Sequence, residues 1–377
     1  MDFEWSEEQR DFREAVVRFA TAELSDSDHS LEWFRVAWKK CADFGIQGLP
    51  VSSDYGGSGS SHLTTVAALE ALGYACSDNG LIFSLNAHMW ACQHPIARFG
   101  NEDQKAKYLP ALCNGSMVGA HAMSEPGAGS DAFALRSTAS LEGDVYRLNG
   151  SKTFVSNAPV ADLFITFART PGTSGFSGLN AFVLESNTAG LRVGPAMTKM
   201  GLHSSRMAEV FFEDCEVPAA NRLGRPGLGM PIFSAAMELE RSMILASTIG
   251  TMERILERTL GYARERRQFD HPIGKFQAVS HPLVEMKLRL ETARLLLYRL
   301  AWLLDNGKPA ALDSALVKLH LSESYVASSL EALQIHGGYG YMVDTGLEQE
   351  VRDALAARIY SGTSEIQRNL AARHLGL

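Results

Sequence analysis

The sequence predicts an α+β chain of several domains, with a helical part at each end and a compact β part between them. Three observations support this fold class: helical apolar spacing near the start, a group of short strand-like runs in the middle, and three long helical patterns at the end. A chain of 377 residues is long enough for two or three domains of roughly 150 residues each. We place the domain limits at residues 1–118, 119–222 and 223–377.

The first helical part begins with a capped helix. In the segment SEEQRDFREAVVRFATAEL, Ser6 is a good N-cap and acidic residues fill the first turn. The turn-rich stretch YGGSGSSHLTT then precedes another helix.

The β part is predicted from four short runs rich in Val, Ile, Phe and Thr. These runs are DVYRLNGSKTFVSN, DLFITFART, NAFVLES and AEVFFEDCEVP, and we expect turns at EGD and LNG. Because no long helix intervenes, a compact β domain fits this region better than βαβ units.

The final part is predicted from apolar residues that recur every three or four positions. The three series span Leu245–Ala263, Leu283–Leu304 and Ala315–Leu333. The segment DNGKP stops the second series, and Gly337-Gly338 ends the third. One apolar stripe on each helix is typical of a helical bundle.

Composition excludes several classes of protein. The net charge of −8 argues against non-specific nucleic-acid binding and leaves only a local basic groove open. Five widely spaced cysteines without a C-x-x-C pair argue against a zinc site and against a disulfide framework. The opening MDFEWSEEQRDF has no apolar segment, so we expect no signal peptide, and no apolar run reaches the ~18 residues of a membrane span. We therefore expect a soluble cytoplasmic protein.

Three glycine-containing motifs suggest ligand contacts. In MSEPGAGSD, at residues 123–131, the glycines allow close backbone approach and the serines supply hydroxyl groups. In ERRQFDHPIGKFQ, Arg266 and Arg267 suit a diphosphate, although cations in a last helical turn also suit the helix dipole. QIHGGYGY is a helix C-cap with a glycine turn, in which His336 by itself is better explained as a structural residue.

Taken in order, these motifs resemble the acyl-CoA dehydrogenase flavoprotein family, and the resemblance covers nearly the whole chain. It is carried by EPGAGSD, RxQFxxPIxxFQ, QxxGGxGY and GTSEIQR. The resemblance implies an N-terminal helical domain, a central β-barrel and a C-terminal four-helix bundle. It also implies FAD as the cofactor, an acyl thioester as the substrate and a homotetramer.

The resemblance also assigns residues to the expected FAD site. Ser124 would bond the N5 edge of the flavin. The residues expected to line the flavin and the thioester are His121, Met123, Gly129 and Ser130, and those flanking the flavin ring are Phe154, Val155 and Ser156. The residues expected to hold the rest of FAD, partly across a dimer interface, are Arg266, Gln268, Phe276, Gln277, Gln334, Gly337, Gly338, Thr363 and Glu365. Ser130 and Arg241 are the expected substrate contacts. Asp270 departs from the family's usual glycine and adds a negative charge near the diphosphate, unless it points away.

The family reaction needs a carboxylate that removes the α proton of the thioester. Most members carry this glutamate immediately before the GTS triplet, where this chain has Ser361. A serine hydroxyl is too weak a base, but the backbone N–H of Ser361 can still donate to the thioester carbonyl. Some members instead carry the base just before an arginine on the first helix of the bundle, which here is the pair Glu240-Arg241.

The spacing alone leaves the role of Glu240 open. On a regular helix it falls off the apolar stripe that begins at Leu245, and its own face continues through Ile244, Ser247 and Thr251. That face is either a substrate cleft or plain solvent, and pattern alone favours solvent. The missing carboxylate at Ser361 reverses this preference, so we expect Glu240 to be the base, with Glu238 as the nearby competitor.

The finer resemblance is to the biosynthetic branch that oxidises prolyl or other acyl groups on carrier proteins. It is carried by SDNGLIFSLNAHMWACQHPI, RRQFDHPIGKFQAVSHPLVEMKLRLETARLLLYR and SGTSEIQ. A dehydrogenase of short or branched acyl-CoA is the main alternative, and a non-catalytic flavin-binding scaffold is a second. The electron acceptor is either an electron-transfer flavoprotein or O2, the latter making the protein an oxidase.

Overall fold

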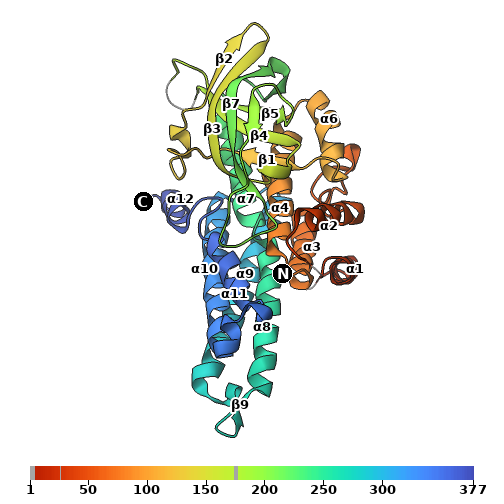
Figure 1. The fold of residues 1–377 in the computed structure, drawn as a ribbon, viewed down its shortest axis with the longest axis vertical. Helices are drawn as coiled ribbons and strands as arrows, with labels where there is room; N and C mark the ends of the chain where they lie inside the picture. Colours follow the sequence, from red (N-terminus) through yellow and green to blue (C-terminus); the bar gives the residue numbers. More distant parts are fainter. Residues whose placement is uncertain (1–4, 26, 174–176) are drawn as a thin grey trace.

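The computed structural model describes residues 5–25, 27–173 and 177–377, so the first four residues of the opening segment lie outside it. Figure 1 shows an elongated molecule with the strands at its upper end and long C-terminal helices reaching its lower end. The predicted order of a helical, a β and a second helical part is confirmed. The exact domain limits remain predictions.

The N-terminal part is a set of short helices that begin at polar caps. Its helices are α1 (Glu7–Glu23), α2 (Leu31–Phe44), α3 (His62–Ala75), α4 (Asn79–Ala87), α5 (His94–Phe99) and α6 (Glu102–Cys113). Ser6 caps α1 in a reciprocal arrangement with Gln9, as predicted from the sequence. One π-helical segment, His88–Gln93, joins α4 to α5 without a break. Such wide turns occur frequently at functional sites.

The β part is one sheet of eight strands. These are β1 (Gly119–Ala122), β2 (Thr138–Glu142), β3 (Val145–Ser156), β4 (Leu163–Arg169), β5 (Leu179–Glu185), β6 (Leu191–Val193), β7 (Met207–Pro218) and β8 (Arg222–Leu223). The strand order is β6-β7-β3-β2-β4-β5-β8, and β1 pairs with β4 in parallel. Among the described strands no pairing joins β6 to β8, so closure into a barrel remains a prediction.

One of the two predicted turns in this sheet is wrong. The turn at EGD forms between β2 and β3, but the segment LNG lies within β3. There the register against β7 shifts between Leu148 and Gly150, which is a bulge rather than a reversal of the chain. A Cβ at Gly150 would lie 2.4 Å from the Oγ atom of Ser137, so this glycine permits close strand packing instead of a turn.

The C-terminal part contains six helices and a small hairpin. The elements are α7 (Gly229–Met243), α8 (Ala246–Glu265), β9 (Arg267–Gln268), β10 (His271–Pro272), α9 (Gln277–Asp305), α10 (Ala311–His336), α11 (Leu347–Ala356) and α12 (Ser364–His374). Our projection of Glu240 onto the stripe beginning at Leu245 assumed one continuous helix and is wrong in that respect. Helix α7 ends at Met243 and α8 begins at Ala246, so Glu240 and the apolar stripe lie on different helices.

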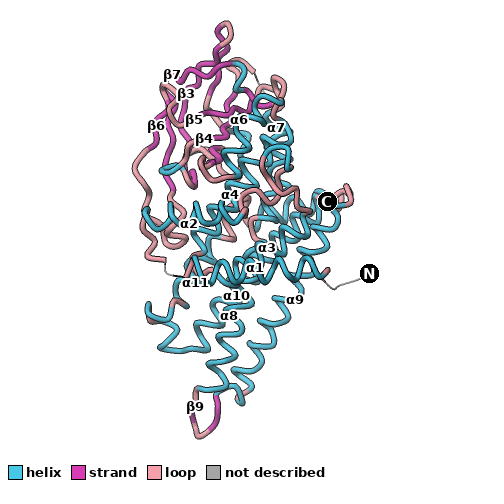
Figure 2. Tube along the Cα trace, turned by 90° about the vertical axis from the view of Figure 1, so that its right-hand side faces the viewer, coloured by secondary structure: helices cyan, strands magenta, loops and turns pink. Residues whose placement is uncertain are grey.

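The tip of the β9–β10 hairpin explains the residue that departs from the family pattern. Gln268 pairs with His271, and the two residues between them, Phe269 and Asp270, have φ values of 51° and 63°. Two left-handed residues in a two-residue loop form the turn that matches strand twist, and aspartate tolerates this conformation well. The hairpin reaches the lower end of the molecule in both views (Figures 1 and 2).

The helical parts share a single hydrophobic core. It runs from Val16 in α1 through Leu69 in α3 to Met252 in α8 and Leu297 in α9. A second core lies between the sheet, α6 and α7, and includes Leu109, Phe167 and Ile232. Helix α7 therefore lies where the sheet meets both sets of helices, and it carries Glu240 to that junction.

Helices α3 and α8 cross with their backbones in close contact. A Cβ built at Gly73 would lie 1.8 Å from the carbonyl oxygen of Ser247, and one built at Gly250 would lie 1.9 Å from that of Glu70. Only glycine leaves room for this crossing at either position.

No helix in the described part of the chain is long and apolar enough to cross a membrane. The five cysteines are all buried and none forms a disulfide.

Candidate active site

Glu240 is a buried acid with one unoccupied oxygen. Its side chain is on α7, and the residue is only 7% exposed. Oε1 accepts a hydrogen bond of 2.7 Å from the hydroxyl of Ser361, whereas Oε2 is buried and has no hydrogen-bond partner within the described structure. A buried polar atom without a partner is costly unless a ligand satisfies it. The reading of Glu240 as a solvated residue is therefore wrong.

Burial also prepares Glu240 to accept a proton near neutral pH. Loss of solvent raises the pKa of this carboxyl to about 7, and the Ser361 hydroxyl and the charges of Arg241 and Lys318 oppose that rise. Lys318 is itself fully buried, with its Nζ atom donating a 2.8 Å hydrogen bond to the carbonyl of Ala357. No ion pair joins Glu240 to a cation among the described residues, so the carboxyl titrates close to physiological pH.

Arg241 follows Glu240 but binds its own helix. Its Nε donates a 2.7 Å hydrogen bond to the carbonyl of Met237, and the side chain is half-buried. Burial lowers the pKa of the Arg241 guanidinium, yet the group remains cationic. Its expected contact with the substrate remains a prediction.

Ser361 has an unusual backbone. Its φ is 53°, a left-handed value that non-glycine residues rarely adopt, and this turns the residue toward α7. Its N–H has no hydrogen-bond partner in the described chain, so this donor is available to a ligand. The sequence predicted that donor, but it did not predict that the hydroxyl would hold Glu240.

The motif MSEPGAGSD is tied to β3 by a buried ion pair. Lys152 Nζ lies 2.7 Å from Oε1 of Glu125, and both side chains are buried. The Glu125 carboxylate also accepts the backbone N–H groups of Arg136 and Ser137 at 2.6 and 3.0 Å. The backbone N–H of the residue after Lys152 donates to the carbonyl of Ser124 at 2.9 Å, so the pair fixes the loop that presents Ser124.

Neither Glu125 nor Lys152 was among the predicted site residues. The available signal was a single charged residue in each of two otherwise uncharged segments, SEPGAGS and KTFVSN. Charged residues are almost never fully buried unless they are paired, but the sequence does not show which ones are buried.

Replacing Lys152 with Met tests the importance of this pair for stability. We expect Lys152→Met to lower the free energy of unfolding by about 3–5 kcal/mol, because the Glu125 carboxylate stays buried without its cation. Urea unfolding followed by circular dichroism measures the change. The double variant Lys152→Met/Glu125→Gln should recover part of the loss, and equal stability of the wild-type and single-variant proteins would contradict the argument.

Phe154 is an exposed aromatic residue held in a strained conformation. The register of β3 against β7 shifts between Lys152 and Val155, and Phe154 lies in that bulge with a φ of 55°. It is 65% exposed, whereas Val155 is buried and Ser156 is half-buried. Strain of this kind is typical of ligand-binding positions, and an exposed ring offers a flat surface to an aromatic ligand.

His121 supplies another unsatisfied atom beside the same loop. Its Nε2 is buried and makes no hydrogen bond in the part of the chain described, and burial lowers the pKa of the imidazole to about 4. The ring centroid lies 5.5 Å from that of Phe167 and 6.2 Å from that of Phe233. Of the other predicted residues in this loop, Met123 is buried, Ser124 is half-buried, and Gly129 and Ser130 are exposed.

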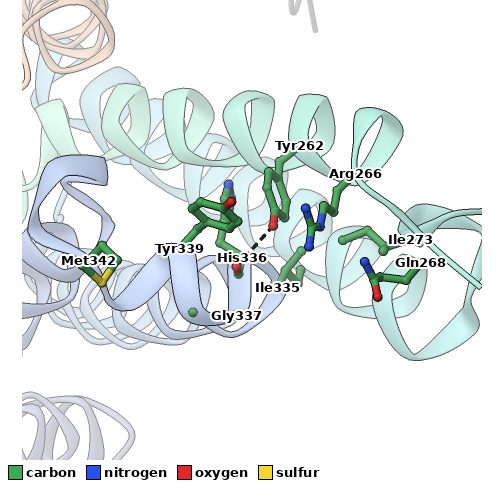
Figure 3. Close-up of a pocket in the computed structure, with 10 residues that line it drawn as sticks. Tyr262, Arg266, Gln268, Ile273, Ile335, His336, Gly337, Tyr339 and Met342 are labelled. Atoms are coloured by element: carbon green, nitrogen blue, oxygen red, sulfur yellow. Dashed lines mark hydrogen bonds between the residues drawn. The ribbon is translucent and has the colours of Figure 1, made fainter.

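A separate pocket of about 600 Å³ lies near the lower end of the molecule. It contains Arg266, Gln268, Gly337 and Gly338 of the predicted set, together with Tyr339 and others (Figure 3). The Arg266 guanidinium lies 5.7 Å from the centroid of the Tyr339 ring. The structure therefore brings the two arginine- and glycine-containing motifs together.

His336 has a structural position in the wall of this pocket. Its ring stacks on Tyr262 with centroids 4.2 Å apart, and its Nδ1 lies 2.7 Å from the carbonyl oxygen of Ala332. The Tyr262 hydroxyl donates a long hydrogen bond of 3.4 Å to the His336 carbonyl (Figure 3).

The remaining predicted residues lie outside the lining of that pocket. Phe276, Gln277 and Gln334 are exposed near it, with Phe276 packing edge-on against Phe269 at 6.1 Å between centroids. Thr363 caps α12 by accepting the N–H of Ile366. Helix α12 packs against the middle of α10, where Ser364 donates to Glu323, whereas the pocket lies at the C-terminal end of α10, so one chain does not bring the whole predicted set together (Figure 1).

Comparison with known proteins identifies the family of this chain. Models for the N-terminal, middle and C-terminal domains of acyl-CoA dehydrogenase match residues 6–116, 120–215 and 227–376. The chain belongs to the acyl-CoA dehydrogenase family.

The similar proteins extend over the full length of the chain. A protein of Pseudomonas fluorescens, named L-prolyl-(peptidyl-carrier protein) dehydrogenase, is 42% identical and covers 100% of both chains. The crystal structure of the prolyl acyl carrier protein oxidase AnaB has a TM-score of 0.95 at 48% identity, covering 99% of this chain and 100% of its own. The FAD complex of PigA has a TM-score of 0.96 at 42% identity and covers 100% of both chains.

Proposed function

We propose that this protein is an FAD-dependent dehydrogenase of acyl thioesters, acting on a prolyl-type or other acyl group attached to a carrier protein in secondary metabolism. The observation that carries the proposal is the buried, unoccupied Oε2 of Glu240. The full-length similarity to proteins named for prolyl carrier substrates supports the choice of substrate class.

The residues present fit FAD. The exposed ring of Phe154 and the unsatisfied Nε2 of His121 flank the loop that presents Ser124, where the flavin would lie. The pocket with Arg266 and Gly338 would hold the adenylate and diphosphate. When bound, FAD would supply the acceptor for the β hydrogen of the substrate, which leaves as a hydride.

The chain's own residues supply the other half of the reaction. Glu240 takes the α proton onto Oε2 as the two C–H bonds break and the α,β double bond forms. The free N–H of Ser361 donates to the thioester carbonyl and stabilises the negative charge that develops there. Burial keeps water away from the carboxylate and raises its basicity.

The pH dependence of this proton transfer follows from the ionised form of Glu240. Because the carboxylate is the reactive species, the rate of anaerobic flavin bleaching should rise with pH through the Glu240 pKa of about 7. The Ser361 hydroxyl lowers that pKa, so Ser361→Ala should move the rise to higher pH. Stopped-flow measurements between roughly pH 5.5 and pH 9 check this.

A neighbouring serine provides the control for that experiment. Ser364 donates a 2.7 Å hydrogen bond to Glu323 rather than to Glu240, so Ser364→Ala should leave the pH profile in place. An unchanged profile in the Ser361→Ala protein would show that the hydroxyl does not set the basicity of Glu240.

We also propose that the protein assembles as a homotetramer. One face of α9 carries the large exposed apolar residues Val284, Leu288, Leu295 and Trp302. The two separated groups of FAD residues support assembly, because a second copy supplies the part of the site that each copy lacks. A solution mass of four chains by light scattering supports the tetramer, and a mass of one chain contradicts it.

Anaerobic flavin bleaching with a panel of substrates tests the function as a whole. We expect bleaching by prolyl-loaded carrier protein and less by short acyl-CoA, and no bleaching with any thioester would reject the proposal. Peroxide release during aerobic turnover distinguishes an oxidase from an enzyme that passes electrons to an electron-transfer flavoprotein. A cytoplasmic location remains a prediction.

A further inference from the structure

A small cavity lies close to Glu240, because its wall includes Ile244, whose backbone N–H donates to the Glu240 carbonyl, and Tyr360, which precedes Ser361. Its volume is about 30 Å³, and its wall also includes Ser247 and Thr251 of α8. Space of this size accommodates one or two water molecules. An acyl chain extending past the base would therefore meet a nearly closed end.

The aromatic rings of Phe83 and Tyr360 pack against each other in the wall of this cavity. Both residues line the cavity, and their ring centroids are 4.7 Å apart at an angle of 53°. Tyr360 immediately precedes Ser361, which holds Glu240. Burial raises the pKa of Tyr360, and the nearby charges of Glu240 and Asp353 raise it further.

The far wall of the cavity is polar but already satisfied. Asn79 Nδ2 donates to Asp353 at 3.1 Å and to Glu350 at 2.9 Å, and the Thr251 hydroxyl donates to Asn79 at 3.3 Å. These groups need no hydrogen bond from a ligand. The shape of the cavity, rather than an unpaired polar group, therefore controls what can enter.

We propose that Phe83, packed on Tyr360, limits the substrate to a compact acyl group such as a prolyl ring or a butyryl chain. Linear chains of six or more carbons are excluded because their distal carbons would occupy the position of the Phe83 ring. This inference rests on the proposed function, since it takes the acyl group to extend from Glu240 toward the cavity.

The test compares prolyl, butyryl and hexanoyl thioesters of pantetheine in anaerobic flavin bleaching. Phe83→Ala joins the acyl site to the cavity behind it and should raise the hexanoyl-to-butyryl ratio of kcat/KM by about tenfold or more, because each added methylene gains apolar contact. The matched control is Ile82→Ala, which enlarges another wall of the cavity and leaves the ring pair in place. Its ratio should stay within about twofold of the wild-type ratio.

The outcomes distinguish a failure of the size limit at Phe83 from a failure of the proposed function. If Phe83→Ala does not fold, Phe83→Leu removes the ring with a smaller loss of volume, and flavin absorbance confirms that FAD is bound. If wild-type enzyme oxidises a short thioester and neither Phe83 variant changes the ratio, the size limit is wrong and the proposed function stands. If Ile82→Ala raises the ratio equally, cavity volume rather than the ring pair sets the limit. If wild-type enzyme oxidises none of the three thioesters, the proposed function itself fails.

Discussion

Glu240→Gln is expected to slow anaerobic flavin bleaching by at least about 100-fold, in line with the 10²–10⁴-fold contribution of a positioned general base. Glutamine has nearly the same shape, and its amide oxygen can accept the hydrogen bond that Ser361 now donates to the carboxylate. The fold and the bound FAD should therefore be retained. Stopped-flow bleaching measures the rate, and the flavin spectrum of the resting protein confirms that the cofactor is present.

Glu238 provides the comparison for this experiment. It is on the same helix and half-buried, but its side chain makes no hydrogen bond to Ser361. Glu238→Gln should keep most of the wild-type rate. If Glu238→Gln abolishes bleaching while Glu240→Gln does not, the base has been assigned to the wrong residue.

Gly338→Leu is expected to yield a folded protein with weakened FAD binding. A Cβ at Gly338 meets no atom within 4 Å, and its φ lies outside the left-handed range, so the chain itself has room for a side chain there. Gly338 lines the pocket with Arg266, so a leucine would fill space that we assign to the adenylate and diphosphate. We expect FAD to bind at least about tenfold more weakly, because a built-in clash acts only against the ligand.

Gly261, a second glycine with open surroundings, provides a control that shows whether any glycine-to-leucine substitution lowers the FAD content. Gly261, in α8, also meets nothing within 4 Å and does not line the pocket. Gly261→Leu should retain one FAD per chain, as measured by flavin absorbance, and both variants should give wild-type circular dichroism. A Gly338→Leu protein with full FAD content would show that the cofactor lies elsewhere.

The sequence predicted the general fold because apolar periodicity reports on local structure. The Ser6 cap, the strand runs and the ends of the long helices all follow from nearby residues. The sequence did not predict the interruption between α7 and α8 at Ile244. The apolar spacing begins at the next residue and does not indicate where the preceding helix ends.

From the sequence, a residue of the candidate site could be predicted only where the residue type at a single position indicated its role. Ser361 in place of a glutamate directed attention to Glu240, and the burial of Glu240 agrees with that inference. The ion pair of Lys152 with Glu125 and the ring pair of Phe83 with Tyr360 join residues far apart in the chain. Periodicity contains no information on such long-range pairing, so these contacts required the structure.

The crossing of α3 and α8 restricts how this chain can be recombined. Since the backbones touch at Gly73 and Gly250, a chimera that takes its first helical part from one homologue and its last from another must preserve both glycines and the angle between the helices. Ser247, which touches Gly73, and Thr251, which follows Gly250, both line the cavity close to Glu240. A small mismatch between exchanged segments would therefore displace residues in the wall of that cavity.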